Sequence, residues 1–407
     1  MKEKVIQHVQ QTSLTIVLSE IQAIRRKNTV RTACRVYKDG KIGISGCIGK
    51  ADEKELFAKA EQNLEYQIDY PVEPTENLKS HTKIDECKIT DGELCNDVDK
   101  ILKELTRLHP DFTVSHKVNL NEIECKMENE LGMDLSFSDR TIQVAMLLRQ
   151  KGSSDIMNTA FGIPTRKLEP EKIIKASSEL ISAYTNMLPF PKEPLPLILQ
   201  DNIVTPIFDR DLSAKLMGTG SSLFQKQIGQ EVFAKNFSLK IENDPIESFS
   251  PTFDMEGVIT PDNLTYLVKD GVILRPYSDK RTSKMYGYEN TGCAIGGSYD
   301  SVPTLGSPKL NIESGQKSLK ELLNGQMGLL VMFAGGGDFT PDGKYASPVQ
   351  LAYLTDGEKL IGRVPEFTIK SSIYDIFGKN FIGMSSDRLY TNNNDRMLVT
   401  RMDIEQL

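Results

Sequence analysis

Histidine is scarce in this sequence of 407 residues. There are only four, His8, His81, His109 and His116, so the last 291 residues (407 minus 116) contain none. That part of the chain offers no imidazole as a general base, a proton relay or a metal ligand, which excludes a serine or cysteine triad confined to it. The four histidines have no acidic or cysteine partner at ligand spacing, and we interpret them as surface or loop residues.

Paired cysteines and long apolar runs are also lacking. The six cysteines form no C-x-x-C pair, which argues against a zinc ribbon or a redox motif and favours reduced thiols in the cytoplasm. Cys293 has no histidine in its half of the chain, and we interpret it as a buried or turn residue. The polar N-terminal residues do not resemble a secretory signal. The uncharged run Leu322–Gly337 contains five glycines, so we expect a buried strand rather than a membrane span.

No strong excess of positive charge is present. The 49 Lys and Arg residues face 56 Asp and Glu residues, which gives a formal net charge of -7. We therefore expect neither nucleic acid nor an anionic membrane as a direct ligand. With 39% hydrophobic and 26% charged residues, the composition is typical of a soluble globular protein, and the length indicates two domains.

Proline marks the predicted boundary between these domains. Four of the 19 prolines fall within the eight residues from Pro189 to Pro196. Such clusters interrupt regular structure and are typical of linkers. We predict an N-terminal α+β domain over residues 1–188, a proline-rich linker over 189–206 and a mainly β C-terminal domain over 207–407.

The N-terminal half shows two similar cycles of strands and helix. Alternating residues and the turn Lys38–Lys41 predict strands joined by a hairpin, and helical spacing of apolar residues predicts helices. The first cycle has strands at 13–19, 30–37 and 42–47 and a helix at 51–66; the second has a helix at 96–108, strands across 113–148 and a helix at 169–187. The two cycles suggest an internal duplication.

Short strands and glycine turns dominate the C-terminal half. Asp-Gly turns at Lys269–Val272, Pro341–Lys344 and Thr355–Glu358 predict hairpins of an antiparallel sheet. Two helices are expected within this half, at 222–237 and 318–323. The fold class is therefore α+β.

Several stretches of the chain match one family in order and spacing. They are Arg35–Gly43, Phe253–Val258, Leu267–Ile273, Tyr286–Gly287, Thr291–Gly292, Leu329–Val331, Gly335–Phe339 and Val364–Ile369. Together they resemble the TldD/TldE family, also called PmbA or "modulator of DNA gyrase" proteins. The resemblance covers nearly the whole chain, although no single stretch is diagnostic alone.

This resemblance implies a cytosolic zinc metallopeptidase made of two related subunits, of which only the TldD-like one carries H-E-x-x-x-H and a later cysteine ligand. Here Gln225 and Gln230 stand at the histidine positions and Lys226 at the glutamate position, and no cysteine follows Cys293. Amide oxygens bind zinc poorly, and an ammonium group repels a dication. The chain therefore resembles the TldE/PmbA-like branch that lacks the zinc motif, with no catalytic residue or metal of its own and zinc expected in the partner.

The resemblance implies a non-zinc subunit that supplies part of a chamber and a substrate-binding surface to a TldD-like catalytic partner. Its substrate would be an unfolded peptide, and the isolated chain could form a homodimer. Gly335, Gly336 and Gly337 are either a turn or bulge or a place where a substrate strand approaches the backbone. The segment from Leu212 to Gly220 is shorter than expected for TldE-like proteins.

Two other functions stay open from the sequence. The chain could act alone as a non-enzymatic binding or modulator protein. Alternatively, it could be an independent hydrolase in which Asp254, Glu256 or Asp338 bind a hard divalent ion.

Overall fold

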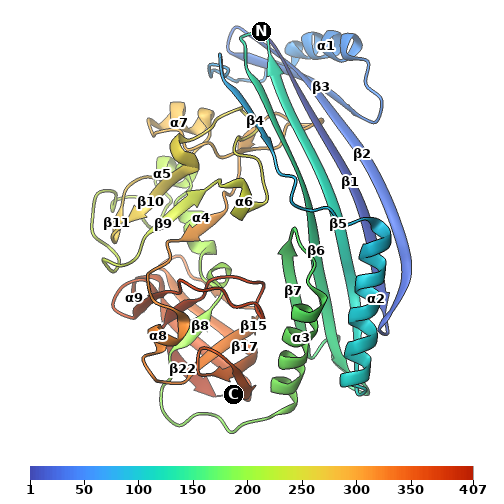
Figure 1. Ribbon diagram of the computed structural model, residues 1–407. Coiled ribbons are helices and arrows are strands. Elements are labelled where there is room, and N and C mark those ends of the chain that lie inside the picture. The colour runs from blue at the N-terminus through green and yellow to red at the C-terminus, as the bar shows by residue number, and fades with distance from the viewer. Residues whose placement is uncertain (407) are drawn as a thin grey trace.

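The computed structural model describes residues 1–406 of the chain. Figure 1 shows a tall, curved sheet of long strands beside a body of shorter strands. The tall sheet has seven strands in the order β3-β2-β1-β5-β6-β4, with β7 also paired to β6. Its strands are β1 (Lys2–Val17), β2 (Glu20–Lys38), β3 (Lys41–Ile48), β4 (Lys79–Lys83), β5 (Phe112–Asn129), β6 (Asp134–Gln150) and β7 (Thr159–Thr165).

The long hairpins follow from local turn chemistry and alternation. Asp39 and Gly40 have φ of 52° and 71°, the left-handed pair that a two-residue hairpin turn requires, so the predicted turn between β2 and β3 is confirmed. Strands β5 and β6 pair without interruption from Phe112 opposite Gln150 to Glu128 opposite Asp134. Alternate residues of β6 are buried, as expected for strands with one face in a core.

Helices cover the tall sheet. They are α1 (Glu53–Gln62), continued by the 3-10 turn η1 (Asn63–Tyr66), α2 (Asp91–Leu108) and α3 (Pro170–Thr185). Thr90 and Glu93 form a capping box at the start of α2, whose apolar stripe from Leu94 to Leu105 packs with α3 and the sheet. The three helices predicted in this half are present, although α2 begins five residues before the predicted start at 96.

The body of shorter strands contains the remaining sheets. A nine-stranded sheet has the order β20-β21-β8-β15-β17-β19-β22, with β16 and β18 on β17; a four-stranded sheet has the order β11-β10-β9-β14; and β12 pairs with β13. The strands are β8 (Leu197–Leu199), β9 (Leu239–Glu242), β10 (Leu264–Lys269), β11 (Val272–Ile273), β12 (Ala294–Ile295), β13 (Thr304–Leu305), β14 (Leu310–Ile312), β15 (Gly328–Ala334), β16 (Asp338–Phe339), β17 (Lys344–Thr355), β18 (Leu360–Arg363), β19 (Phe367–Ser372), β20 (Phe381–Met384), β21 (Leu398–Thr400) and β22 (Asp403–Gln406).

Short helical segments connect these strands. They are η2 (Asp201–Ile203), α4 (Pro206–Asp211), α5 (Ala214–Thr219), α6 (Pro245–Ser248), η3 (Pro261–Asn263), α7 (Lys280–Tyr286), α8 (Leu319–Leu323) and α9 (Ile373–Ile376). The predicted α+β class with an antiparallel C-terminal part is confirmed, as are the three Asp-Gly hairpins and the helix at 318–323. The run Leu322–Gly337 is only partly strand, since β15 occupies residues 328–334.

The helix predicted at 222–237 is wrong. The segment forms successive turns, and its phenylalanines are held by tertiary packing instead of a helical face. Phe224, Phe233 and Phe237 surround Phe208, with ring centroids 5.5–5.8 Å apart. Gly229, with φ of 79°, would break a helix in the middle of the segment. The apolar residues whose spacing predicted a helix therefore belong to one buried aromatic cluster and not to one face of a helix.

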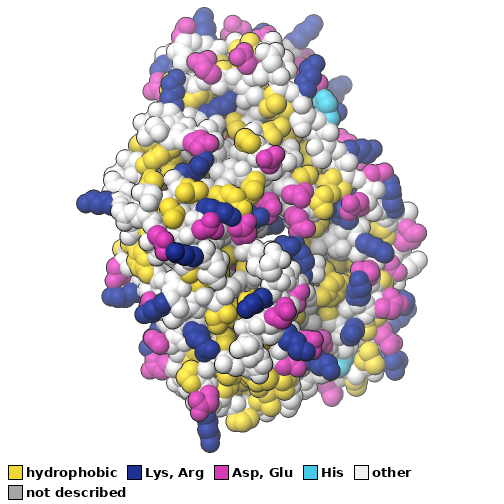
Figure 2. Space-filling model, turned by 60° about the vertical axis from the view of Figure 1, so that its left-hand side comes forward, with side chains coloured by type: hydrophobic (Ala, Val, Ile, Leu, Met, Phe, Trp, Pro, Cys, Tyr) yellow, Lys and Arg dark blue, Asp and Glu magenta, His cyan; other side chains and the backbone are white. Residues whose placement is uncertain are grey.

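The predicted linker is not devoid of regular structure, because β8 lies within residues 189–206 and pairs with β15 and β21. The domain boundaries themselves stay a prediction. No helix of the described residues is long and apolar enough to cross a membrane. Figure 2 shows acidic and basic side chains interspersed over one face of the molecule.

Candidate functional site

The three residues that the resemblance predicts at the zinc-motif positions, Gln225, Lys226 and Gln230, lie together on one exposed set of turns between α5 and β9. The side chains of Gln225 and Lys226 are exposed, and Gln230 folds back so that its Nε2 donates to the carbonyl oxygen of Lys226 at 2.9 Å. The neighbouring Gln227 donates from Nε2 to the hydroxyl of Tyr374 at 3.3 Å. The three positions thus carry two neutral amides and one ammonium group, with no helix to align them.

These residues do not fit a zinc ion. Zinc prefers imidazole, thiolate or carboxylate ligands, and none of the three side chains is one of these. Cys293 is buried, and this burial raises the pKa of its thiol to about 12, far from the thiolate that a metal needs. Within residues 1–406, no three His, Cys, Asp or Glu side chains gather as a metal site would require.

The three glycines of the second candidate site form a break between β15 and β16. Both strands pair with β17, and Gly335–Gly337 bulge out between them. Gly335 exchanges two hydrogen bonds with Gln350: its N–H donates to Oε1 at 3.0 Å, and its carbonyl accepts from Nε2 at 3.1 Å. Gly336 has φ of 86° with open space around it, whereas a Cβ on Gly337 would lie 2.2 Å from that of Ser347.

Exposed backbone is the property of this bulge that a peptide could use. Strand β8 pairs with β15 only at Leu329 and Leu330, so no strand of the described residues continues that pairing along β15. Residues 335–338 are exposed. An extended peptide could therefore approach the backbone at Gly336, where there is no side chain.

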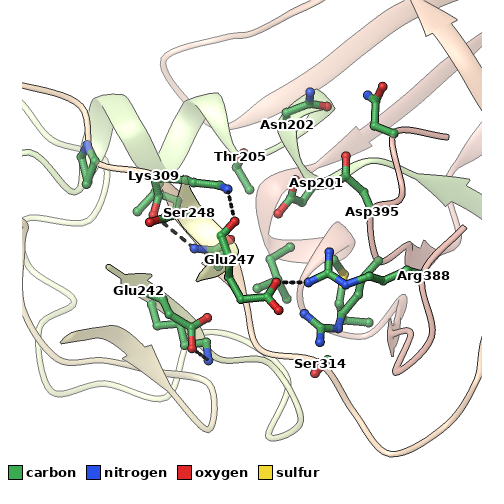
Figure 3. Close-up of a pocket in the computed structure, with 18 of the residues that line it drawn as sticks. Asp201, Asn202, Thr205, Glu242, Glu247, Ser248, Lys309, Ser314, Arg388 and Asp395 are labelled. Atoms are coloured by element: carbon green, nitrogen blue, oxygen red, sulfur yellow. Dashed lines mark hydrogen bonds and ion pairs between the residues drawn. The ribbon is translucent and has the colours of Figure 1, made fainter. Parts of the chain in front are cut away.

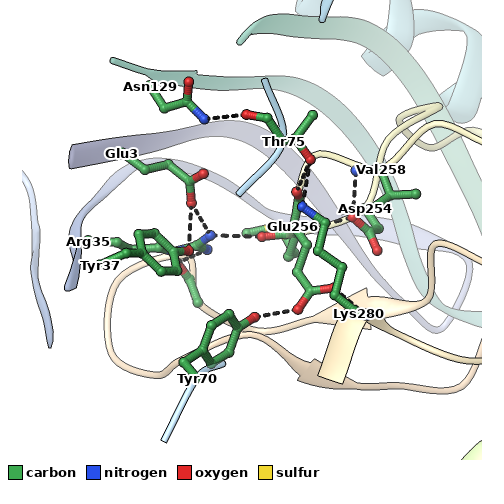
Figure 4. A network of polar contacts seen from close by, with 12 residues as sticks. Glu3, Arg35, Tyr37, Tyr70, Thr75, Asn129, Asp254, Glu256, Val258 and Lys280 are labelled. Carbon is green, nitrogen blue, oxygen red and sulfur yellow. Dashed lines mark hydrogen bonds and ion pairs between the residues drawn. The ribbon is translucent and has the colours of Figure 1, made fainter. Parts of the chain in front are cut away.

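The two acidic residues near position 255 have structural partners. Figure 4 shows Asp254 at a tight turn, where its carboxylate accepts from the backbone N–H groups of Glu256, Val258 and Ala294, each at 2.9 Å. Burial nevertheless raises the pKa of Asp254 to about 6. Three N–H donors occupy this carboxylate, which leaves little capacity for a cation.

Glu256 is engaged in the same way. Its carboxylate accepts from the Tyr70 hydroxyl and from the backbone N–H of Lys280, at 2.8 Å for the latter. Burial, and then the neighbouring Asp254, raise the pKa of Glu256 to about 7. The third candidate, Asp338, is exposed on β16 and accepts from the N–H of Phe339 at 2.6 Å. The structure gives all three carboxylates roles in local folding and does not bring them to one metal site.

Sequence reasoning missed a buried arginine at the centre of this network. The guanidinium of Arg35, on β2, is fully buried and donates to Glu3, to the Met255 carbonyl and to the Gly297 carbonyl, each at 2.8 Å (Figure 4). It therefore joins the tall sheet to two loops of the C-terminal half. Its acceptors are mostly backbone carbonyls, which have no sequence signature.

These features define a two-part α+β protein whose candidate site is built from amides, exposed backbone and structural carboxylates. Residues 196–404 match the family model described as the PmbA/TldA metallopeptidase C-terminal domain. The chain therefore belongs to the PmbA/TldA metallopeptidase family, and the resemblance predicted from its motifs is confirmed.

Curated relatives match part of the chain. A metalloprotease TldD homolog from Haemophilus influenzae is 29% identical over 173 residues, which cover 41% of this chain and 35% of that protein. The corresponding protein from Buchnera aphidicola is 24% identical over 172 residues, or 42% of this chain and 35% of that one. The matches thus span about a third of the length of these relatives.

Solved structures match the whole fold. TldE from Thermococcus kodakarensis superposes with a TM-score of 0.81 at 18% identity, over 100% of this chain and 96% of that one. A proposed modulator of a DNA gyrase from Thermotoga maritima gives 0.78 at 18% identity, over 99% and 95% of the two chains. At such low identity, these likenesses show a common fold.

Proposed function

We propose that this chain is the non-zinc, TldE/PmbA-like subunit of a two-subunit TldD/TldE-type peptidase. The observation that carries the proposal is the set Gln225, Lys226 and Gln230, which places amides and an ammonium group where the zinc-bearing branch has its motif. The likeness to TldE over the whole chain supports it. In this proposal a TldD-like partner holds the zinc and performs hydrolysis.

The contribution of this chain would be to line the chamber and bind the unfolded substrate. The exposed bulge Gly335–Gly337 supports this role, because a strand edge recognises extended peptides through backbone hydrogen bonds regardless of their sequence. Alone, the chain is expected to be inactive and able to self-associate through the surface that the partner would cover.

The test is co-expression with a TldD-like protein that carries H-E-x-x-x-H. Size-exclusion chromatography with mass detection reports assembly, and cleavage of an unstructured peptide reports activity, for each chain alone and for the mixture. A 1:1 complex with activity only in the mixture supports the proposal. Stoichiometric zinc in the isolated chain, or an inert chain that ignores the partner, contradicts it; the second result favours a stand-alone modulator.

A matched pair of variants separates the roles of the two candidate places. Gly336→Val adds a branched side chain to the exposed bulge and should reduce peptide cleavage by the mixture without preventing assembly, because backbone pairing is blocked. Lys226→Ala removes the ammonium group and should leave cleavage unchanged, since the zinc is expected in the partner. Loss of cleavage by Lys226→Ala alone would place chemistry in this chain.

A further inference from the structure

One cavity of the described residues lies away from the two candidate sites, the turns at 225–230 and the bulge at 335–337. It has a volume of about 640 Å³, opens to solvent, and is lined by residues of η2, α4, β9, α6, β14 and the loop before β21. Pro164 of β7 also reaches its wall, so the cavity lies where the tall sheet meets the C-terminal body. Its size is in the range of pockets that hold small molecules.

Two carboxylates without a positive partner lie on one wall. Figure 3 shows Asp201 and Asp395 next to each other at the cavity. Within the described residues neither forms an ion pair, whereas the nearby Arg388 pairs with Glu247. Asp395 accepts one hydrogen bond, from Nε2 of Gln200 at 3.1 Å. Burial, and then the like charge of Asp395, raise the pKa of Asp201 to about 6.

Further polar groups of the cavity also lack partners. Thr205 is only 8% exposed and lines the cavity, yet its hydroxyl forms no hydrogen bond within residues 1–406. Oδ1 of Asp209 is buried and has none either. Lys309, on the opposite side in Figure 3, makes only a long contact of 3.5 Å from Nζ to the carbonyl of Glu247. Buried polar groups are almost always paired, so the buried Oδ1 of Asp209 and the mostly buried Thr205 indicate a missing ligand, whereas Lys309 is an exposed ammonium group at the rim of the cavity.

We propose that this cavity binds a small zwitterion, namely a free amino acid or a short peptide, with its ammonium group between Asp201 and Asp395 and its carboxylate at Lys309. An ammonium group offers three donors, which suits two carboxylates and the hydroxyl of Thr205. Charge-assisted hydrogen bonds of this kind are the strong ones. The site is a property of this chain and does not depend on the proposed partner.

A divalent metal fits the cavity less well. Calcium and magnesium take six or more oxygen ligands, and no cluster of three metal-binding side chains exists in the described part of the chain. Lys309 is close enough to lower the pKa of both carboxylates by its charge, and the same charge would repel a dication. A ligand with charges of both signs can pair with the two aspartates on one side and with Lys309 on the other.

The experiment is calorimetric titration of the full chain with triglycine near neutral pH. N-acetyl-triglycine lacks the ammonium group, and triglycine amide lacks the carboxylate, so each tests one wall without altering the protein. We expect triglycine to bind, the acetylated peptide to bind at least about tenfold more weakly, and the amide to be weakened to a smaller extent.

Isosteric variants locate the site. Asp201→Asn and Asp395→Asn should each weaken triglycine binding about tenfold, Lys309→Met should weaken triglycine but not its amide, and Asp342→Asn, at an exposed hairpin turn, should have no effect. Thermal melts verify that the variants fold; if the two aspartate variants do not, the modified peptides decide. Equal binding of acetylated and free triglycine, absence of triglycine binding, or binding of calcium or magnesium chloride in its place would overturn the proposal.

Discussion

Two buried arginines join the tall sheet to the C-terminal body, and they do so in different ways. Arg166, at the end of β7, forms a two-point pair with Asp139, from Nε to Oδ1 at 3.0 Å and from Nη2 to Oδ2 at 2.7 Å. It also donates to the carbonyls of Pro245 and Ile246, each at 2.8 Å. Arg35 makes a single contact with Glu3 and likewise donates to two distant carbonyls.

The difference lies in how well each charge is compensated. The Arg166 guanidinium is slightly exposed and lies 4.4 Å from the ring centre of Phe249. Arg35 is completely buried, and its Nε has no partner. Because a buried charge is costly when a partner is lost, the joint at Arg35 is the more sensitive of the two. The two arginine joints therefore connect the same two parts of the molecule, but the protein tolerates substitution of Arg166 better than substitution of Arg35.

The largest effect is expected at Arg35. Arg35→Met leaves the carboxylate of Glu3 buried with only the Tyr37 hydroxyl, at 3.0 Å, as a donor. We expect the free energy of unfolding to fall by about 3–5 kcal/mol, measured by urea denaturation. Adding Glu3→Gln removes the unpaired charge and should restore much of the loss. If the double variant is no more stable than Arg35→Met, unpaired charge is not the cause.

A smaller loss is expected at Arg166. Arg166→Met leaves the buried Asp139 with the backbone N–H of Arg140, at 2.8 Å, as a donor, next to a site where the guanidinium itself is slightly exposed. The expected decrease is about 2–3 kcal/mol in the same assay. A loss as large as that of Arg35→Met would refute the ranking of the two joints. Since Ile246 and Phe249 also line the cavity, this variant should weaken triglycine binding, which Arg35→Met should not.

Two glycines test how rigidly the Arg35 guanidinium is held. Gly297, whose carbonyl accepts from Arg35, has φ of 69°, and a Cβ there would lie 2.4 Å from Nη2 of Arg35. Gly336 has φ of 86° but nothing within 4 Å. Gly336→Ala should cost about 1 kcal/mol of backbone strain, and Gly297→Ala about 2 kcal/mol, because the buried guanidinium cannot move away. Equal losses, measured by urea denaturation, would show that the guanidinium adapts.

Sequence patterns predicted those parts of the fold that depend on neighbouring residues. The turn at Lys38–Lys41 and the helix at 318–323 have local signals, namely Asp-Gly and a Ser-x-x-Glu capping box, and both are present. The prediction of a helix at 222–237 failed because Phe224, Phe233 and Phe237 pack around Phe208, which lies outside that segment. The local spacing of apolar residues cannot distinguish a helix from an irregular segment whose apolar residues pack against a distant part of the chain.

The candidate sites also differ in whether neighbouring residues reveal them. Gln225, Lys226 and Gln230 can be predicted from the sequence as the residues at the zinc-motif positions, because that motif spans only a few neighbouring residues. The joint at Arg35 cannot, since its carbonyl acceptors are 220 and 262 residues away. The cavity is equally hidden, because Asp201 and Asp395 are almost 200 residues apart and meet only through the pairing of β8 with β21.

A small effect that depends on pH is expected at the carboxylate of Glu256, beside the Arg35 joint. The pKa of Glu256 is raised to about 7 in the folded state, against an ordinary value of 4.5. Between these values the folded state binds the proton more tightly than the unfolded state, so this group's contribution to stability is greatest at low pH and falls as pH rises. Glu256→Gln removes the titration.

The Glu256→Gln variant should therefore gain about 1–2 kcal/mol relative to the wild type between about pH 5 and pH 7.5, by urea denaturation at each pH. The substitution Glu193→Gln, at an exposed residue, serves as the control and should show the same pH dependence as the wild type.

The two arginine variants test whether the Arg35 joint keeps water from Glu256. Arg166→Met should leave the gain unchanged, because Asp139 and Arg166 lie apart from Glu256. In Arg35→Met the nearby joint is broken, so water reaches Glu256 and the gain should shrink. If the gain is the same in both arginine variants, the Arg35 joint does not keep water from Glu256 and the proposed difference between the two joints is wrong.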